Sequence, residues 1–197
     1  MAAGFTYNLT PEEIKEERYD VETGRRRRGP YKLDTENLPV GEYLPSFTPI
    51  AADLKKKTAT VCVRAKVVEA YTNGGEALTI KVAKGSLLAS GMYIGNGSKG
   101  AQVSSIDKTN ASYDTVTIAA QFGANLSVGD VLFEATAVGG TTPKAVANSA
   151  LYERAKIESG IVLVALLMRA FEIEPDKLVI PFHAKDKANM PYFQFNE

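Results

Sequence analysis

Alternating apolar and polar positions first indicate β-strands at residue 58. The run TATVCVRAKVVEAY (58–71) is rich in β-branched residues and is followed by Asn73-Gly74-Gly75, a sequence typical of a tight hairpin turn. The next run, ALTIKVA (77–83), is predicted to be the returning strand of that hairpin. A β domain is therefore expected to begin soon after residue 50.

The pattern that follows occurs twice, with the copies 38 residues apart. Each copy reads as a strand, a glycine turn, a buried leucine, a second glycine turn and a strand, which is typical of a small domain built from a repeat. We therefore predict a mainly β fold in which residues 51–140 form a small pseudo-symmetric β-barrel or sandwich. The aligned pairs are Leu78 and Val116, Thr79 and Thr117, Ile80 and Ile118, Gly85 and Gly123, Leu88 and Leu126, Gly91 and Gly129, and Ile94 and Leu132. The fold-defining turns are predicted at Gly85, Gly91, Gly123 and Gly129.

The first 50 residues carry a different pattern, which predicts an extended N-terminal arm. Thr10-Pro11-Glu12-Glu13 has the chemistry of a helix start, and a short helix is expected to end before Gly24. From there to Pro49 the chain is rich in proline and has little periodicity. We expect this arm to lie on another surface, with no core before about residue 50.

The chain beyond residue 140 is predicted to be a separate element, residues 141–197. The continuous apolar run GIVLVALLMRAFEIE (160–174) is compatible with a helix or a strand, and the β-branched residues at its start favour a strand. A strand that is apolar on both faces needs cover, and identical tails of neighbouring subunits would supply it. The tail is therefore predicted to be a β oligomerisation element. The candidate contacts are Ile161, Leu163, Leu166, Phe171, Tyr192, Phe193 and Phe195.

The overall charge narrows the choice of partners. The 197 residues contain 23 Lys and Arg and 23 Asp and Glu, so the net charge gives no reason to expect nucleic acid, a membrane surface or an acidic substrate. The apolar runs are too short to cross a bilayer, and the first residues lack the layout of a signal peptide. These features indicate a soluble protein that is made in a cytoplasm.

The four consecutive cations Arg25, Arg26, Arg27 and Arg28 are the most prominent local charge. Arginine binds carboxylates and phosphates through its forked geometry, although such a run can also be merely solvated. Acidic residues lie close by in the sequence, and no aromatic stacking platform accompanies the arginines, so an acidic protein surface is favoured over nucleic acid. The four arginines are candidates for contact with a protein partner.

The sequence offers no recognisable catalytic site. Strand alternation places Cys62 on the same face as Arg64 and Lys66, which argues against a deeply buried catalytic thiol, and His183 is the only histidine. The glycine-rich stretch 95–100 lacks the spacing of a phosphate-binding loop, and the scattered aspartates do not match a calcium loop. We therefore predict a protein that is not an enzyme and needs no metal or cofactor.

The order of the segments resembles that of the head fibre proteins of tailed bacteriophages, with the greatest likeness to those of crAss-like phages. The segments are LPVGEYLPSFTPI, LKKKTATVCVRAKVVEA, the paired LTIKVAKG and LSVGDVLFEA, and KANMPYFQF. The resemblance covers roughly residues 40–197. It implies a structural virion protein that sits as an oligomer, expected to be a homotrimer, on the outer surface of the capsid.

This resemblance also implies a division of labour along the chain. Residues 1–50 would attach to the major capsid protein, residues 51–140 would be displayed, and residues 141–197 would join the subunits. The alternative function is a module that binds carbohydrate or the host cell surface, with host-surface glycans as ligands. For that role Tyr71, Tyr93 and Tyr113 are candidate exposed stacking residues.

Overall fold

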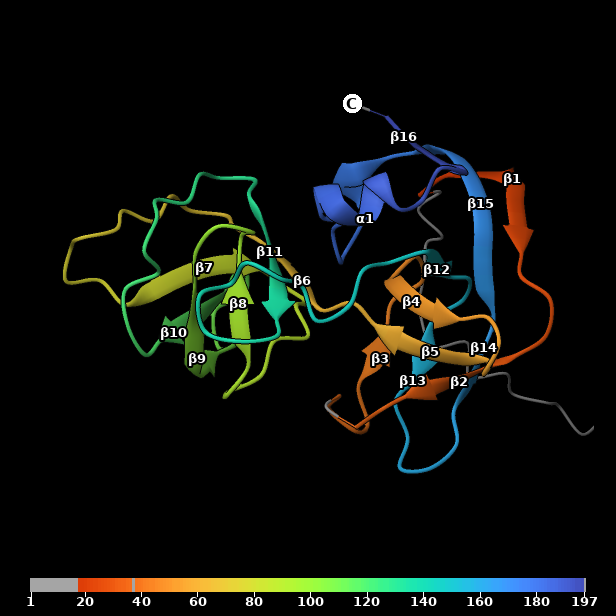
Figure 1. Ribbon diagram of the computed structural model, residues 1–197, viewed down its shortest axis with the longest axis horizontal. Helices are drawn as coiled ribbons and strands as arrows, with labels where there is room; N and C mark the ends of the chain where they lie inside the picture. The colour runs from red at the N-terminus through yellow and green to blue at the C-terminus, as the bar shows by residue number, and fades with distance from the viewer. Residues whose placement is uncertain (1–17, 37, 197) are drawn as a thin grey trace, which may run out of the picture.

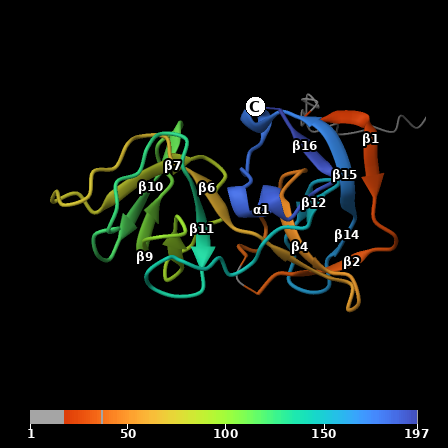
Figure 2. The same ribbon diagram turned by 45° about the horizontal axis from the view of Figure 1, so that its top comes forward.

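The computed structural model describes residues 18–36 and 38–196, which form two β lobes side by side (Figure 1). The small lobe is residues 64–135 and contains strands β6 to β11. The large lobe is residues 18–61 and 148–196, so its strands come from both sides of the small lobe in the sequence. Figure 2, a view turned by 45°, shows the same separation. The chain therefore enters the small lobe from the large lobe and returns to it.

The large lobe is an eight-stranded sheet with a two-stranded sheet beside it. Its first strands are β1 (Asp20–Arg26), β2 (Tyr31–Asp34), β3 (Tyr43–Leu44), β4 (Pro49–Asp53) and β5 (Thr58–Val61). The later strands are β12 (Ser149–Leu151), β13 (Ala155–Lys156), β14 (Leu163–Val164), β15 (Leu166–Ile173) and β16 (Phe193–Phe195). A 3-10 turn at Pro175–Lys177 and the helix α1 (Ala184–Ala188) connect β15 to β16.

The eight-stranded sheet curls back on itself. Its strands follow the order β1, β15, β12, β4, β5, β2, β14, and β16 pairs with β15 as well. The strands β14 and β15 are separated only by Ala165, yet β14 pairs with β2 and β15 pairs with β12. One continuous segment is thus used at two distant points of the sheet, which requires strong curvature.

The prediction that no core forms before about residue 50 is wrong. Tyr31, Leu33, Leu44 and Phe47 are all buried, and β1 pairs with β15 rather than lying as a loose arm. Pro30, Pro39 and Pro45 fall between short strands and Pro49 begins β4, so low periodicity hid elements that the C-terminal strands complete. The strands of the large lobe consequently group across the predicted boundaries at residues 50 and 140.

The helix predicted after Thr10 begins outside the described residues. Where the description starts, Asp20 already opens strand β1. The stretch before Gly24 is therefore at least partly strand, because the β15 backbone offers its hydrogen-bonding edge to residues 20–26.

The small lobe is a closed six-stranded barrel. Its strands are β6 (Arg64–Lys66), β7 (Thr79–Ala83), β8 (Tyr93–Gly95), β9 (Gly100–Asp107), β10 (Tyr113–Ile118) and β11 (Val131–Ala135), in the order β6, β11, β8, β9, β10, β7. The two ends of this order meet at a bridge between Val67 and Val82, where the Val68 amide also donates to the Lys81 carbonyl at 3.0 Å. Closure leaves no long open edge.

The predicted pseudo-symmetry of this barrel is confirmed. The matching strands β7 and β10 pair with each other, as do β8 and β11. The repeated leucines Leu88 and Leu126 are both buried. The four turn glycines all have positive φ, between +82° at Gly85 and +95° at Gly129, a conformation that glycine adopts without steric cost.

The hairpin expected at residues 73–75 forms only in part. The strand run 58–71 divides between the two lobes at Cys62, and it meets the returning strand only around residues 67–69, through the bridge at Val67, the Val68 amide and the Glu69–Lys81 ion pair. The Asn73 loop packs on the second repeat instead, because the Asn73 side chain accepts from the Gly123 amide at 2.8 Å and the Asn125 side chain accepts from the Asn73 amide at 2.8 Å. Residues that are typical of a tight turn thus make contacts with a distant part of the chain.

The C-terminal apolar run is a strand, as predicted. Strand β15 is flanked by β1 on one side and by β12 and β16 on the other, all from its own chain. Cover from a neighbouring subunit is therefore not required for this strand. No helix among the described residues is long and apolar enough to cross a membrane.

Candidate functional site

The junction between the lobes is organised around a buried ion pair. Arg64 at the start of β6 and Asp186 in α1 are both almost fully buried. The Arg64 Nε and Nη2 atoms donate to the two carboxylate oxygens of Asp186, each at 2.7 Å. This forked geometry links the small lobe to the C-terminal part of the large lobe.

The remaining polar groups of this ion pair are also satisfied. The Asp186 carboxylate accepts from the backbone amides of Ala147 at 2.8 Å and His183 at 3.0 Å. The Arg64 guanidinium donates further to the carbonyls of Val63 and Ala145. Because every partner comes from the linkers or from α1, the pair fixes the two crossings between the lobes.

A backbone contact holds the returning linker close to the small lobe. Gly140, in the returning linker, lies so close to Gly95 and Gly100 that a Cβ on any of the three would collide with backbone atoms of the others. The Gly97 amide donates to the Gly140 carbonyl at 3.0 Å. The glycines are required by this close approach, and the returning linker is held against the barrel.

Cys62 and His183 both lie near this junction. Cys62 is fully buried, contrary to the polar face predicted from alternation, because it belongs to a core cluster of the large lobe that includes Phe47 and Leu167. Burial raises the pKa of its thiol to about 12, which keeps it protonated and unreactive. His183 caps α1 by accepting from the Lys185 amide at 3.1 Å, and burial lowers its pKa.

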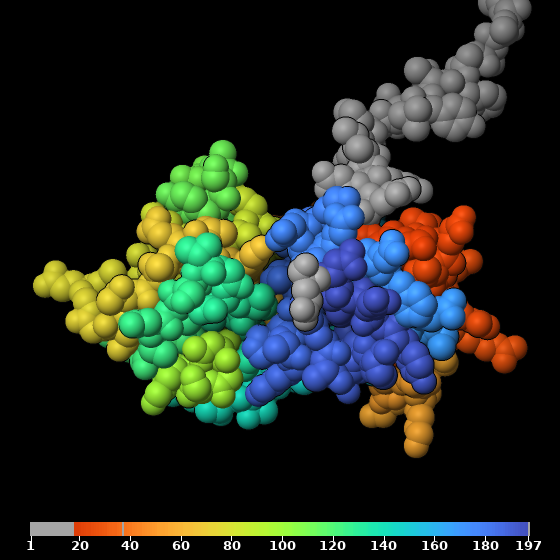
Figure 3. Space-filling view, turned by 90° about the horizontal axis from the view of Figure 1, so that it is seen from above, coloured from red at the N-terminus to blue at the C-terminus, as the bar shows by residue number. Residues whose placement is uncertain are grey.

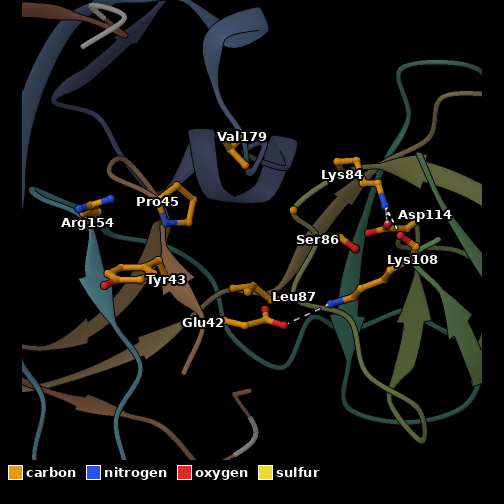
Figure 4. A pocket seen from close by; sticks show the side chains of 11 residues that line it. Glu42, Tyr43, Pro45, Lys84, Ser86, Leu87, Lys108, Asp114, Arg154 and Val179 are labelled. Carbon is orange, nitrogen blue, oxygen red and sulfur yellow. Dashed lines mark hydrogen bonds and ion pairs between the residues drawn. The ribbon is translucent and has the colours of Figure 1, made fainter. Parts of the chain in front are cut away.

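A cleft of about 430 Å³ lies between the lobes and is lined by residues of both (Figure 4). Its charged side chains are largely engaged with one another. Lys84 donates to Asp114 at 2.7 Å, and Lys108 approaches Glu42 across the cleft at 3.8 Å. The buried Ser86 hydroxyl lacks a hydrogen-bond partner among the described residues. No nucleophile and base are brought together here, and no cluster of metal-ligating side chains occurs in the described ranges.

The structure divides the four predicted arginines into two kinds. Arg27 points into the large lobe, where Nε donates to the Ser149 hydroxyl at 2.6 Å and Nη2 donates to the Asn148 carbonyl at 2.9 Å. The Arg26 guanidinium lies 5.0 Å from the ring centroid of Tyr152. The exposed Arg25 and Arg28 side chains make no hydrogen bond or ion pair with another described residue.

The candidate oligomer contacts also fall into two groups. Leu166 and Phe193 are buried within the large lobe, and Phe171 and Phe195 are partly buried. Three side chains are free to meet a partner. They are Ile161, Leu163 and Tyr192, which are 74%, 62% and 64% exposed.

The three tyrosines considered for carbohydrate stacking are not an exposed set. Tyr71 is buried and its hydroxyl donates to Gln121 at 2.6 Å, so the expectation of an exposed ring is wrong there. Tyr93 and Tyr113 are half-buried, and the Lys81 ammonium lies 5.0 Å from the Tyr113 ring. Tyr43, at the cleft, is half exposed and was not singled out from the sequence.

The Arg64–Asp186 pair was missed by sequence reasoning, although two signals were present. His183-Ala184-Lys185-Asp186 has the spacing of a capping box, which marks a helix start. Arg64 lies within a strand run rich in valine, a position where an arginine is either exposed or buried with a partner. Only the fold shows that these two residues meet, 122 positions apart.

Comparison with known proteins gives one match. The family described as "Head fiber protein" matches residues 1–195, which extends to the N-terminal residues outside the resemblance noted above. No curated protein and no solved structure matches. The match concerns the family as a whole, so the closer likeness to crAss-like phages stays a prediction.

Proposed function

The chain belongs to the head fibre protein family and is thus a structural protein associated with a phage virion; we propose that it decorates the outer surface of the capsid as an oligomer. The large lobe attaches to the head and the small lobe projects from it. The observation that carries this proposal is the pair of exposed arginines, Arg25 and Arg28, on the large lobe.

The arrangement of the lobes supports a display role. The buried Arg64–Asp186 pair holds the small lobe against the C-terminal part of the large lobe, and the Gly140 contact holds the returning linker against the small lobe. The small lobe is also closed, so it presents loops rather than open strand edges. A rigid projection of this kind suits a fibre or decoration protein better than a hinged enzyme.

The proposal is tested by adding the purified full-length protein to phage heads that lack fibres. We expect it to sediment with the heads, and electron microscopy should show added density outside the shell. Arg28→Glu should bind at least about tenfold more weakly, because the change opposes like charges across the contact. Lys99→Glu, an equal charge change on the exposed surface of the small lobe, should bind as the wild type does. A protein that stays in the supernatant would refute the attachment role.

We further propose that the subunits form a homotrimer through the exposed part of the tail that includes Tyr192. Large aromatic side chains at the surface are enriched in subunit contacts. Native mass measurement should give three times the 21.2 kDa of one chain, and Tyr192→Ser should shift the population to single chains. Ending the chain at Val146 is not a clean test, because it would remove β12 to β16 and Asp186. A wild-type monomer would refute the trimer.

A glycan-binding role is a second candidate, and Tyr43 favours it. Its ring is half exposed at the cleft, and the Arg154 guanidinium lies 4.9 Å from the ring centroid. Aromatic rings beside charged groups can stack on sugars. Binding on a glycan array that is lost in Tyr43→Ala would support this role, and absence of binding to any glycan would remove it.

A further inference from the structure

Two basic runs that are far apart in the sequence meet on the large lobe. Residues 25–32 contain four arginines and one lysine, and residues 54–57 contain three lysines, with no acidic residue in either stretch. The Lys32 amide donates to the Lys57 carbonyl at 2.8 Å, and Lys57 Nζ donates to the Arg28 carbonyl at 3.1 Å. In Figure 3 the orange-red segment projects to the right of the large lobe and the orange β4–β5 segment projects downward from it.

Lys57 holds this arrangement together while its neighbours point outward. Its backbone has φ of +57°, a left-handed conformation that residues other than glycine, asparagine and aspartate rarely adopt. Its ammonium also donates to the Tyr31 hydroxyl at 3.2 Å and lies 4.8 Å from the Tyr31 ring. The turn is thereby pinned to the loop after β1, and Lys55 and Lys56 remain exposed at its tip.

Exposed apolar residues border these cations. Leu163 on β14 is directly opposite Lys32 on β2 in an antiparallel pair, so the two side chains lie on the same face. Ile161 precedes it in the sequence, and Leu54, 47% exposed, precedes Lys55 in the turn. We call Arg25, Arg28, Lys32, Lys55 and Lys56, together with Leu54, Ile161 and Leu163, the basic face.

We propose that the basic face docks onto an acidic surface of a phage head protein, with carboxylates around an apolar patch. This inference rests on the proposed attachment to the head and adds the residues and the partner chemistry. The contact would include Leu163 and Ile161, which the sequence pattern assigned to subunit assembly. It would also include the lysine turn, which drew no attention in the sequence.

The composition of the basic face favours an acidic protein surface over nucleic acid and over a second copy of this chain. Sites for single-stranded nucleic acid pair cations with exposed aromatic rings, whereas the bordering side chains here are aliphatic and Tyr31 is buried. A two-fold contact between copies would place these cations opposite one another, which is repulsive. An acidic protein surface with an apolar centre would pair with the cations and bury the exposed aliphatic side chains.

The test compares variants of the full-length protein for sedimentation with heads that lack fibres, at about 0.15 M salt. Lys55→Glu with Lys56→Glu should weaken binding at least about tenfold, whereas Lys55→Arg with Lys56→Arg keeps the charge and should bind normally. Leu163→Ser should weaken binding about threefold or more without changing the native mass. Lys99→Glu is the control for a charge reversal elsewhere.

Each outcome decides the proposal. Wild-type binding with no loss in the Lys55 and Lys56 charge reversal would overturn the basic face and leave head attachment standing. A lack of wild-type binding would overturn attachment itself. A change of native mass in Leu163→Ser would assign the face to subunit contact, and equally tight binding of duplex DNA by the wild type would assign it to nucleic acid.

Discussion

The small lobe is built from residues 64–135 alone, whereas the large lobe needs strands from both sides of that stretch. In the small lobe, two similar halves pair strand to matching strand and close a barrel. In the large lobe, strands separated by more than a hundred residues pair with each other, as Asp20 does with Phe171. The small lobe is therefore locally specified, and the large lobe depends on the junction that returns the chain to it.

The largest expected effect concerns that junction. Asp186→Ala leaves the buried Arg64 guanidinium without its carboxylate, and we expect a loss of about 3 to 5 kcal/mol in the free energy of unfolding. Urea denaturation measures this. Asp176→Ala removes the partner of Lys66 in an exposed ion pair and should cost less than about 1 kcal/mol. Equal effects of the two changes would show that the junction does not depend on the buried pair.

The pseudo-symmetry of the small lobe predicts equal losses of stability at matching positions of its two halves. Leu126→Ala and Leu88→Ala each remove a buried side chain at matching positions, and each should cost about 2 to 5 kcal/mol by the cavity left behind. The two values, measured by thermal unfolding, should agree to within about 1 kcal/mol. A large cost at one position and a negligible cost at the other would break the equivalence of the halves.

Cys62 predicts a pH dependence of stability. Its thiol has a pKa of about 12 in the folded protein and 9.0 as an ordinary thiol, so above pH 9 the unfolded chain loses this proton first. The wild type should then lose about 1.4 kcal/mol of stability per pH unit between pH 9 and 12 relative to Cys62→Ala. The comparison of the two proteins cancels the titration of lysines and tyrosines. Parallel stability curves would contradict the buried thiol.

The smallest effect is expected at a turn of the small lobe. Gly129 has φ of +95°, and a Cβ placed there meets no atom within 4 Å. Gly129→Ala should therefore cost only backbone strain, about 1 to 2 kcal/mol. Gly140→Ala, at the crowded junction, should cost more in the same chemical denaturation experiment. The reverse order would indicate that turn geometry matters more than the close approach of the returning linker to the barrel.

The sequence predicted the small lobe well because its contacts follow from local patterns. The repeat of Leu88 and Leu126 and the glycine spacing define the barrel before any long-range contact is known. The run from residue 160 to 174, which contains β14 and β15, was also predicted to be strand from the β-branched residues at its start. In each case the pattern lies within one short stretch of chain.

The large lobe and the candidate surfaces were harder to predict from the sequence. Tyr31 and Leu33 alternate with polar residues over only four positions, and nothing nearby shows that β14 completes their sheet. Alternation placed Cys62 on a polar face because most of the core cluster that buries it, including Leu167 and Phe182, lies far away in the sequence. The lysines at 55–57 gain meaning only when the fold brings them beside Arg28. A local sequence pattern does not show which distant segments of the chain lie beside each other.

The interleaved order of the strands also bears on synthesis. The ribosome makes β1 to β5 first, then the whole small lobe, and only afterwards the strands that complete the large sheet. Since domains tend to fold as they emerge, the small lobe can be finished while the earlier strands still wait for partners. The basic face is complete only once Leu163 has been added. A nascent or prematurely terminated chain therefore lacks part of the surface proposed to bind the head.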